Sequence, residues 1–175
     1  MIAAVAAVDQ NFAIGHHGGM LISIPEDLKM FRELTTGHVV IMGRKTFDAL
    51  PDGPLPGRIN VVISSRAGDG FYQEIHETGR PYYVTSMNLV KQWLNQNAAR
   101  HPLHHFIIGG GQIYEELLPW CERLYLTHID EAFPAADTYF PRIDLKKWQV
   151  IDQSETKQTD KVTYRFCAYE RKATE

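Results

Sequence analysis

Short apolar runs alternate with helical patterns along most of this 175-residue chain. Strand-like runs cover residues 2–8, 38–42, 59–64, 82–84, 105–108 and 123–129. Helical patterns cover residues 25–34, 44–49, 87–95 and 112–117. Several of the runs are apolar throughout, which is typical of parallel strands covered on both faces. The alternation therefore predicts an α/β protein whose helices lie on both faces of a mainly parallel sheet.

The C-terminal part of the chain follows a different pattern. Residues 148–154 and 163–170 have strand composition with no helix between them, which predicts an antiparallel pair at one edge of the sheet. We expect three layers: a central, mainly parallel sheet of about eight strands with this antiparallel C-terminal edge, flanked by about four helices. Because no repeat or linker interrupts the pattern, residues 1–175 are expected to form a single domain.

Composition excludes several classes of protein. Hydrophobic residues make up 44% and charged residues 22% of the chain, close to globular averages. A net charge of −3 gives no reason to bind nucleic acid. The N-terminal apolar run is too short for a signal peptide or a membrane span. Cys121 and Cys167 have no metal-ligand spacing, so we expect a cytoplasmic protein without a metal or a membrane partner.

The strongest local motif is a strand that runs through three glycines into a helix, His105-Phe106-Ile107-Ile108-Gly109-Gly110-Gly111-Gln112-Ile113-Tyr114. Glycines leave backbone N–H groups accessible beside a helix N-terminus, which suits a diphosphate. The motif is not the Gly-x-Gly-x-x-Gly fingerprint. A tight strand-to-helix turn without a ligand explains it about equally well.

Cations follow two other strands. Arg44 and Lys45 come directly after the strand that ends in Met42-Gly43, and Arg66 follows Ser64-Ser65. The carboxyl ends of strands are where open α/β sheets bind ligands. Together these cations could hold a phosphate monoester, which favours NADP over NAD. The alternative is a set of solvated loop cations.

A glycine-broken segment, residues 14–28, leads into the first helix and is a candidate lid. Asp27 falls in the first turn of that helix, where a favourable interaction with the helix dipole is its alternative role. His16 and His17 are adjacent, but neighbouring residues seldom converge on one ion, and we expect no carboxylate or thiol to complete a site. We expect exposed loop histidines.

Six motifs occur together and in order, and the set resembles the dihydrofolate reductase family from about Ile2 to Glu170. The motifs are Ile14-Gly15, Pro25-x-Asp27-Leu28, Val40-Ile41-Met42-Gly43-Arg44-Lys45-Thr46, Leu55-Pro56-Gly57-Arg58, Ile108-Gly109-Gly110-Gly111 and Leu126-Thr127-His128-Ile129. The resemblance implies NADPH-dependent reduction of 7,8-dihydrofolate to 5,6,7,8-tetrahydrofolate, by hydride transfer to C6 and protonation at N5. It also implies a role in one-carbon metabolism, antifolate ligands and, by default, a monomer.

The resemblance assigns roles to residues of the substrate pocket. Asp27 would pair with the pterin 2-amino group and N3, with Thr127 as its hydrogen-bond partner, and burial should raise its pKa. Arg58 would form a bidentate pair with the α-carboxylate of the glutamate tail. The catalytic positions are Asp27, Thr127, Met20 and Ile22. The substrate-binding positions are Val5, Ala6, Leu28, Phe31, Leu50, Arg58, Ile108 and Tyr114, with Ala7 also on the apolar wall.

The resemblance also implies a set of NADPH-binding positions. They are Ala7, Ile14, Gly15, Gly19, Met20, Gly43, Arg44, Lys45, Thr46, Ser64, Ser65, Arg66, Gly109, Gly110, Gly111, Gln112, Ile113 and Tyr114. Within the glycine run, the bond between Gly110 and Gly111 is expected to be cis. Asp137 matches the loop residue that latches the lid near Gly15.

Two positions depart from the family pattern. Where the family usually has Leu-Pro-Trp after the lid, this chain has Leu21-Ile22-Ser23. The indole of that tryptophan donates a hydrogen bond to a water beside the substrate, and Ile22 has no polar group to do so. We expect activity to survive with an altered turnover or pH optimum. Gln112 stands where some relatives have arginine, and Arg66 would compensate for it.

Two alternative functions stay open. A reductase of the same fold that acts on a ribosylaminopyrimidine would share the NADPH site, but it gives no reason for the combination of Asp27 with Arg58. A protein that binds NADPH or folate without turnover is conceivable because the tryptophan is missing.

Overall fold

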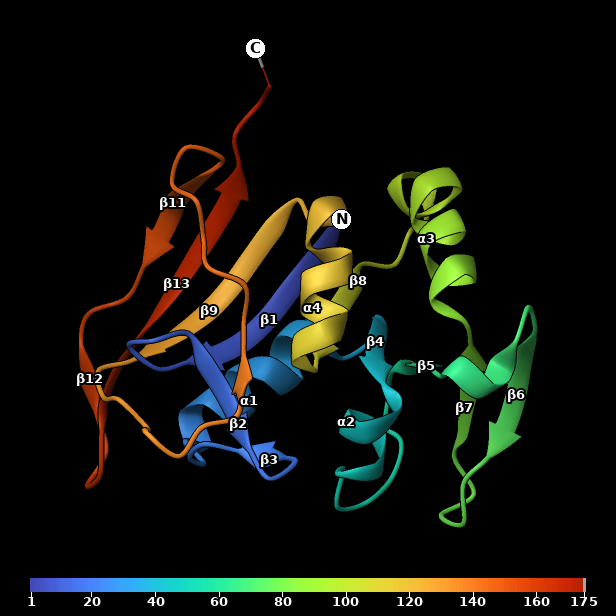
Figure 1. The fold of residues 1–175 in the computed structure, drawn as a ribbon, viewed down its shortest axis with the longest axis horizontal. Helices are drawn as coiled ribbons and strands as arrows, with labels where there is room; N and C mark the ends of the chain where they lie inside the picture. The colour runs from blue at the N-terminus through green and yellow to red at the C-terminus, as the bar shows by residue number, and fades with distance from the viewer. Residues whose placement is uncertain (175) are drawn as a thin grey trace.

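The computed structural model describes residues 1–174, and its main feature is a ten-stranded sheet (Figure 1). The strand order is β11-β13-β9-β1-β8-β4-β5-β7-β6, with β12 beside β13. The strands are β1 (Ile2–Val8), β4 (Val39–Gly43), β5 (Ile59–Ile63), β6 (Phe71–Ile75), β7 (Pro81–Thr85), β8 (His105–Gly109), β9 (Arg123–Ile129), β11 (Trp148–Gln153), β12 (Lys157–Gln158) and β13 (Thr163–Arg171).

The centre of the sheet is parallel, as the alternating pattern predicts. Strands β9, β1, β8, β4, β5 and β7 pair in parallel, whereas β13 pairs antiparallel with β9, β11 and β12. The expected antiparallel C-terminal edge is therefore confirmed. The expected number of about eight strands was too low, because β6 and β12 were missed. All five residues of β6 are exposed at the other edge, so no alternation of buried and exposed side chains marks it.

Four α-helices cover the two faces of the sheet: α1 (Pro25–Thr35), α2 (Arg44–Asp48), α3 (Met87–Gln96) and α4 (Gly111–Leu117). Val90 of α3 and Leu117 of α4 belong to one core cluster with Ile41 and Ile107 of the sheet. On the other face, Phe47 of α2 belongs to a second cluster, and Phe31 of α1 packs against it. The three-layer prediction is confirmed. Three short 3₁₀ turns complete the helical content: η1 (Ser65–Ala67), η2 (Ala98–Arg100) and η3 (Leu118–Trp120).

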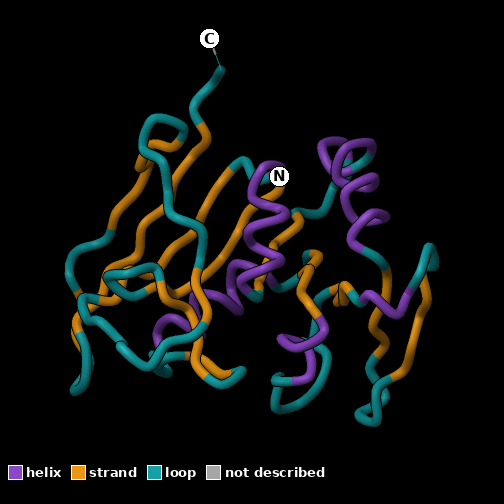
Figure 2. The backbone as a smooth tube through the Cα atoms, in the orientation of Figure 1, coloured by secondary structure: helices purple, strands orange, loops and turns teal. Residues whose placement is uncertain are grey.

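A second, small sheet of order β10-β2-β3 forms where the sequence predicts a lid. It contains β2 (Ala13–His16), β3 (Gly19–Met20) and β10 (Thr138–Tyr139). The loop around β10 thus lies beside the β2–β3 hairpin, although more than 110 residues separate them in sequence (Figure 2). These strands are too short to leave a periodic signal in the sequence.

The carboxyl ends of five adjacent parallel strands meet at one edge of the large sheet. In the register, Gly43 of β4 is opposite Ile63 of β5, and Met42 is opposite Gly109 of β8. On the other side of β8, Ala7 of β1 is opposite Thr127 of β9. The predicted substrate and cofactor positions therefore share this edge. In residues 1–174, no helix is long and apolar enough to cross a membrane.

Candidate active site

A carboxyl group from α1 faces the end of β9. Asp27 is half-buried in the first turn of the helix, and its Oδ1 accepts a hydrogen bond from Thr127 Oγ1. Thr127 itself is fully buried. Burial raises the pKa of the Asp27 carboxyl, and the hydrogen bond from Thr127 opposes part of that rise. Within residues 1–174 no cation pairs with Asp27, so the group is poised to hold or transfer a proton.

Tyr114 of α4 lies across the sheet edge within electrostatic range of Asp27. Its hydroxyl donates to the backbone oxygen of Val5 at 2.6 Å, and the side chain is buried. Burial raises the pKa of Tyr114, with the charge of Asp27 as a second cause. Tyr114 is thus a neutral donor that fixes the end of β1. This contact brings together two of the predicted positions, from α4 and β1.

The apolar side chain nearest to this carboxyl on α1 is Phe31, one turn after Asp27. Phe31, Leu50 and Ile108 pack against the core cluster that contains Val5. The other expected wall residues lie nearby in sequence but pack elsewhere: Ala6 against the cluster on the α3–α4 face, and Ala7 and Ile22 against a third cluster formed around Ile24, Ile129, Val162 and Tyr164. Leu28 is 38% exposed, on the open side of α1. A ring system bound against Phe31 would have the Asp27 carboxyl as its charged neighbour.

Arg58 stands at the outer end of the apolar wall. Its Nε donates to the Pro56 carbonyl at 2.9 Å, and its Nη1 donates to Thr35 Oγ1 at 3.1 Å. The guanidinium lies 6.0 Å from the Phe31 ring centroid. Burial, and then the charge of Arg32, lowers the pKa of Arg58. The side chain is therefore held in place without a carboxylate partner in residues 1–174, and the rest of its guanidinium is available to an anion.

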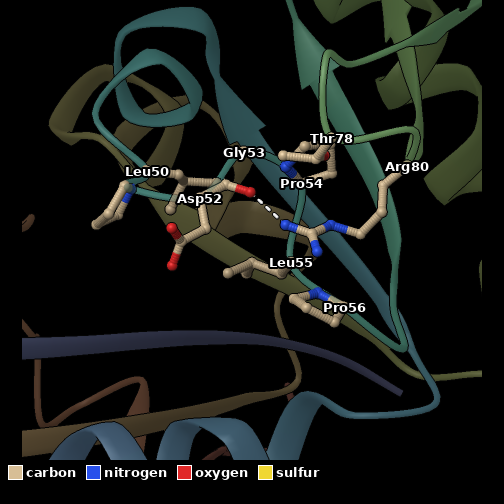
Figure 3. Close-up of a pocket in the computed structure, with 9 residues that line it drawn as sticks. Leu50, Asp52, Gly53, Pro54, Leu55, Pro56, Thr78 and Arg80 are labelled. Atoms are coloured by element: carbon tan, nitrogen blue, oxygen red, sulfur yellow. Dashed lines mark hydrogen bonds between the residues drawn. The ribbon is translucent and has the colours of Figure 1, made fainter.

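A cavity of about 390 Å³ adjoins this wall (Figure 3). Leu50, Asp52 and Leu55 line it on one side and Arg80 on the other. The Arg80 guanidinium points at the loop and donates to the Asp52 carbonyl (Figure 3). Arg80, in the turn between β6 and β7, therefore contacts the loop that carries both Leu50 and Arg58.

The predicted cofactor positions gather at the ends of β8, β4 and β5. Arg44 and Lys45 begin α2 directly after β4, and Ser65 and Arg66 begin η1 directly after β5. All four side chains are exposed. Arg44 Nε lies 3.2 Å from Asp48 Oδ1, and Ser64 Oγ accepts from the Arg66 backbone N–H at 3.3 Å. The expected cluster of cations at neighbouring strand ends is present.

The glycine-rich turn lies next to these cations. A Cβ at Gly43 would come within 3.0 Å of Ile113, and one at Gly110 within 3.5 Å of Thr46 Oγ1, so the two strand-to-helix turns are in contact. The cis peptide bond joins Gly109 and Gly110. The expectation of a cis bond between Gly110 and Gly111 was wrong. Gly110 is the N-cap of α4, and its carbonyl accepts the Tyr114 N–H at 3.0 Å, which places the Gly110–Gly111 bond already in the helical geometry.

The lid closes over this edge through backbone contacts. The Asp137 N–H donates to the Gly15 carbonyl at 3.0 Å, as expected of the latch. A Cβ at Gly15 would lie 2.9 Å from the Gly19 carbonyl, and one at Gly111 would lie 3.0 Å from Tyr139 O. The approach at Gly15 requires glycine, and the one at Gly111 is tight for any larger residue. The segment around β10 thus touches both the lid and the glycine-rich turn.

Three predicted positions are not brought into the site by side-chain contacts. Met20, at the end of the hairpin, is 61% exposed. Ile14 packs against the core on the α3–α4 face. Gln112 Nε2 donates to Glu116 Oε1 at 3.2 Å on the exposed face of α4.

The histidines of the lid differ from expectation. A carboxylate does reach them: potential ligand atoms of His16, His17 and Asp137 lie within 4.8 Å of one another. His17 is exposed as expected, but His16 is half-buried. The interpretation failed because Asp137 is 120 residues away in sequence and arrives through the pairing of β10 with β2.

Two further polar groups near the site were missed. Glu26, next to Asp27, accepts from the Tyr164 hydroxyl at 2.6 Å and lies 2.9 Å from Lys157 Nζ, which ties α1 to β12 and β13. The buried Asp9 carboxylate accepts backbone N–H groups of Asn11, Ala13 and Phe133 at 2.8–2.9 Å and anchors the base of the lid. Apart from Asn11 and Ala13, all these partners are more than 120 residues distant, so no local pattern marks them.

Comparisons with known proteins agree with this arrangement. The sequence profile of the dihydrofolate reductase family matches residues 1–171. Dihydrofolate reductase of Bacillus subtilis (strain 168) is 34% identical over 174 residues, which cover 98% of this chain and 95% of the relative. That of Neisseria gonorrhoeae is 36% identical over 169 residues and 96% of each chain.

A solved structure is similar over nearly the whole fold. Dihydrofolate reductase from Enterococcus faecalis, complexed with NADP(H) and RAB-propyl, superposes with a TM-score of 0.81 at 30% identity. The superposition covers 99% of this chain and 97% of that one. With the profile match and the full-length relatives, it establishes that this chain belongs to the dihydrofolate reductase family.

Proposed function

We propose that this NADPH-dependent oxidoreductase reduces 7,8-dihydrofolate to 5,6,7,8-tetrahydrofolate and so serves one-carbon metabolism. The observation that carries the proposal is the half-buried Asp27 carboxyl, hydrogen-bonded to Thr127 and, within residues 1–174, without a cation. An aminopyrimidine edge offers two N–H donors in a row, and a carboxylate can accept both. A pterin fits this group better than a substrate that lacks such an edge.

The opposite end of the substrate would meet Arg58. A planar guanidinium with donors left free can take a carboxylate in a bidentate pair, which lysine cannot reproduce. Phe31, one turn after Asp27 on α1 and 6.0 Å from the Arg58 guanidinium, offers apolar surface between these two groups for the ring system. The combination favours a folate, with its aminopyrimidine and its glutamate tail, over a ribosylaminopyrimidine.

NADPH fits the ends of β8, β4 and β5. Exposed Arg44, Lys45 and Arg66 follow two neighbouring strands, and the glycine-rich turn beside them presents backbone without side chains. We assign the 2′-phosphate to these cations and the diphosphate to the glycines. When bound, NADPH supplies the hydride that adds to C6 of the pterin.

The residues of the chain govern the proton that goes to N5. Asp27 holds the pterin edge, and its raised pKa keeps the carboxyl able to carry a proton closer to neutral pH. Water reaches N5 from the lid side, where Met20 is exposed and Ile22 offers no hydrogen bond. We propose that Ile22 alters the pH optimum or the turnover without abolishing the reaction.

The test follows reduced-nicotinamide absorbance after the protein is mixed with NADPH and dihydrofolate. The loss of absorbance should require both compounds, and Asp27→Asn should slow it by about 10²–10⁴-fold. Glu26→Gln is the matched control, because it neutralises the neighbouring carboxylate, which faces Tyr164 and Lys157 instead.

Equal rates in Asp27→Asn and wild type would refute the assigned role of Asp27. A wild type that shows no turnover while NADPH still raises its melting temperature would favour the binding protein without catalysis. We further propose that the chain acts as a cytoplasmic, single-domain monomer. All the groups named above come from one chain, and both cysteines are buried free thiols. Sedimentation would test the oligomeric state.

A further inference from the structure

Three potential metal ligands converge at the tip of the lid. His16 ends β2, His17 follows it, and Asp137 precedes β10, which pairs with β2. Ligand atoms of all three lie within 4.8 Å of one another. Two ligands of a tetrahedral zinc ion lie about 3.3 Å apart, given bond lengths of about 2.0–2.2 Å. The ligand atoms would therefore need to approach one another by at most about 1.5 Å to bind zinc. His17 and Asp137 are exposed, so their side chains can rotate to do so.

The backbone explains why two neighbouring histidines meet. Successive side chains of a strand point to opposite faces, but His17 has a φ of 47°, in the left-handed region, where the hairpin turns. The two imidazole centroids are consequently 3.9 Å apart. The fold itself thus holds both rings together.

Asp137 is oriented towards the histidines by hydrogen bonds. Its Oδ2 accepts the His17 backbone N–H at 3.0 Å, and its Oδ1 accepts the Thr138 hydroxyl at 2.8 Å. Each carboxylate oxygen of Asp137 keeps a further lone pair for an ion. The His16 ring has a buried Nδ1 without a hydrogen-bond partner in residues 1–174, so that ring also has an uncommitted nitrogen.

We propose that His16, His17 and Asp137 bind one divalent transition-metal ion of the Zn²⁺ class, with water in the remaining position. Two imidazoles and one carboxylate suit such an ion, whereas Ca²⁺ and Mg²⁺ prefer all-oxygen sites. The ligands come from both β2 and the segment before β10, so the ion ties the β2–β3 hairpin to that segment. Its role is structural, and the site is independent of the proposed reaction.

The test is calorimetric titration of ZnCl₂ into the tag-free, chelator-treated full chain. We expect one ion per chain, and His17→Asn and Asp137→Asn should each weaken binding by at least about tenfold. At position 17, asparagine is chosen because it tolerates the left-handed backbone. At position 137, it is chosen because its amide oxygen can still accept the His17 backbone N–H. His76→Gln, in the β6–β7 turn, is the control and should bind Zn²⁺ as the wild type does.

A second readout follows the lid itself. Zn²⁺ should slow amide hydrogen exchange of residues 15–20 in the wild type and have no such effect in His17→Asn. The proposal is overturned if the wild type binds no Zn²⁺ or binds Ca²⁺ as tightly as Zn²⁺. It is overturned equally if the two asparagine variants match the wild type, or if His76→Gln loses as much affinity as they do.

Discussion

Histidine 105 should make the protein sensitive to mild acid. It begins β8, and its side chain is 1% exposed. Its Nε2 lies 3.0 Å from Trp93 Nε1, which can only donate, so the neutral ring must accept at that nitrogen. Protonation of His105 Nε2 would place its N–H opposite the Trp93 N–H, so that two donors would face each other. Burial, and then the charge of His101, lowers the pKa of His105 to about 4.

The sign and size of the effect follow from linkage. In the unfolded chain the ring has an ordinary pKa of about 6.5. Between that value and the folded pKa of about 4, the unfolded state binds a proton that the folded state does not. Stability is therefore complete above pH 6.5 and falls as the pH drops. The full difference in pKa corresponds to about 3.4 kcal/mol, of which about 2 kcal/mol is lost by pH 5, and screening by water at the half-buried His101 side leaves about 1–2 kcal/mol of that loss.

The assay is urea unfolding at pH 7.5 and pH 5, followed by tryptophan fluorescence. His105→Gln keeps an acceptor for the Trp93 N–H but cannot titrate, so its loss of unfolding free energy between the two pH values should be about 1–2 kcal/mol smaller than that of the wild type. Trp93→Phe removes the opposing N–H donor, so it should also make the loss of unfolding free energy between pH 7.5 and pH 5 smaller than in the wild type. If His105→Gln loses as much stability as the wild type, the reasoning about this ring is refuted.

Four further variants probe the site and the lid. Arg58→Lys should raise KM for dihydrofolate about tenfold with little change in kcat, because the bidentate pair is lost. Thr127→Val removes the hydrogen bond that lowers the pKa of Asp27, so the alkaline limb of the pH–rate profile, where Asp27 loses its proton, should move to higher pH; a shift to lower pH would contradict the assignment. Asp9→Ala leaves three backbone N–H groups without an acceptor and should lower the free energy of unfolding by roughly 3 kcal/mol in urea titration. Ile22→Trp should change the pH–rate profile, and an unchanged profile would argue against a role for this position in proton delivery.

Local sequence was enough to predict most of the sheet and the helices. Residues 2–8 and 123–129 are strands with the predicted bounds. Residues 2–8 are marked by an apolar run that is mostly buried on both faces of the sheet. Pro25 and the acidic residues after it mark the start of α1 correctly. The positions of Arg44 and Arg66 at one edge then follow from the topology, because they come after β4 and β5, which are parallel neighbours.

Contacts between distant segments could not be predicted in the same way. Edge strand β6 exposes every residue, so burial imposes no pattern on its sequence. Asp137 reaches His16 and His17 only because a two-residue strand, β10, pairs with β2. Nothing in the composition of either segment specifies that pairing. The lid is consequently the part of the site where interpretation of the sequence was least accurate.

Contacts between distant segments also show how the chain accommodates Ile22 where the family usually has tryptophan. Ile22 packs against the cluster of Ile24 and Tyr164, and the Tyr164 hydroxyl donates to Glu26, beside Asp27. An apolar side chain at position 22 therefore adds to the packing that fixes the start of α1. The position of the Asp27 carboxyl is set by that packing and by Thr127, neither of which needs an indole. What the replacement removes is a hydrogen-bond donor towards solvent, so its consequences fall on proton delivery rather than on substrate placement.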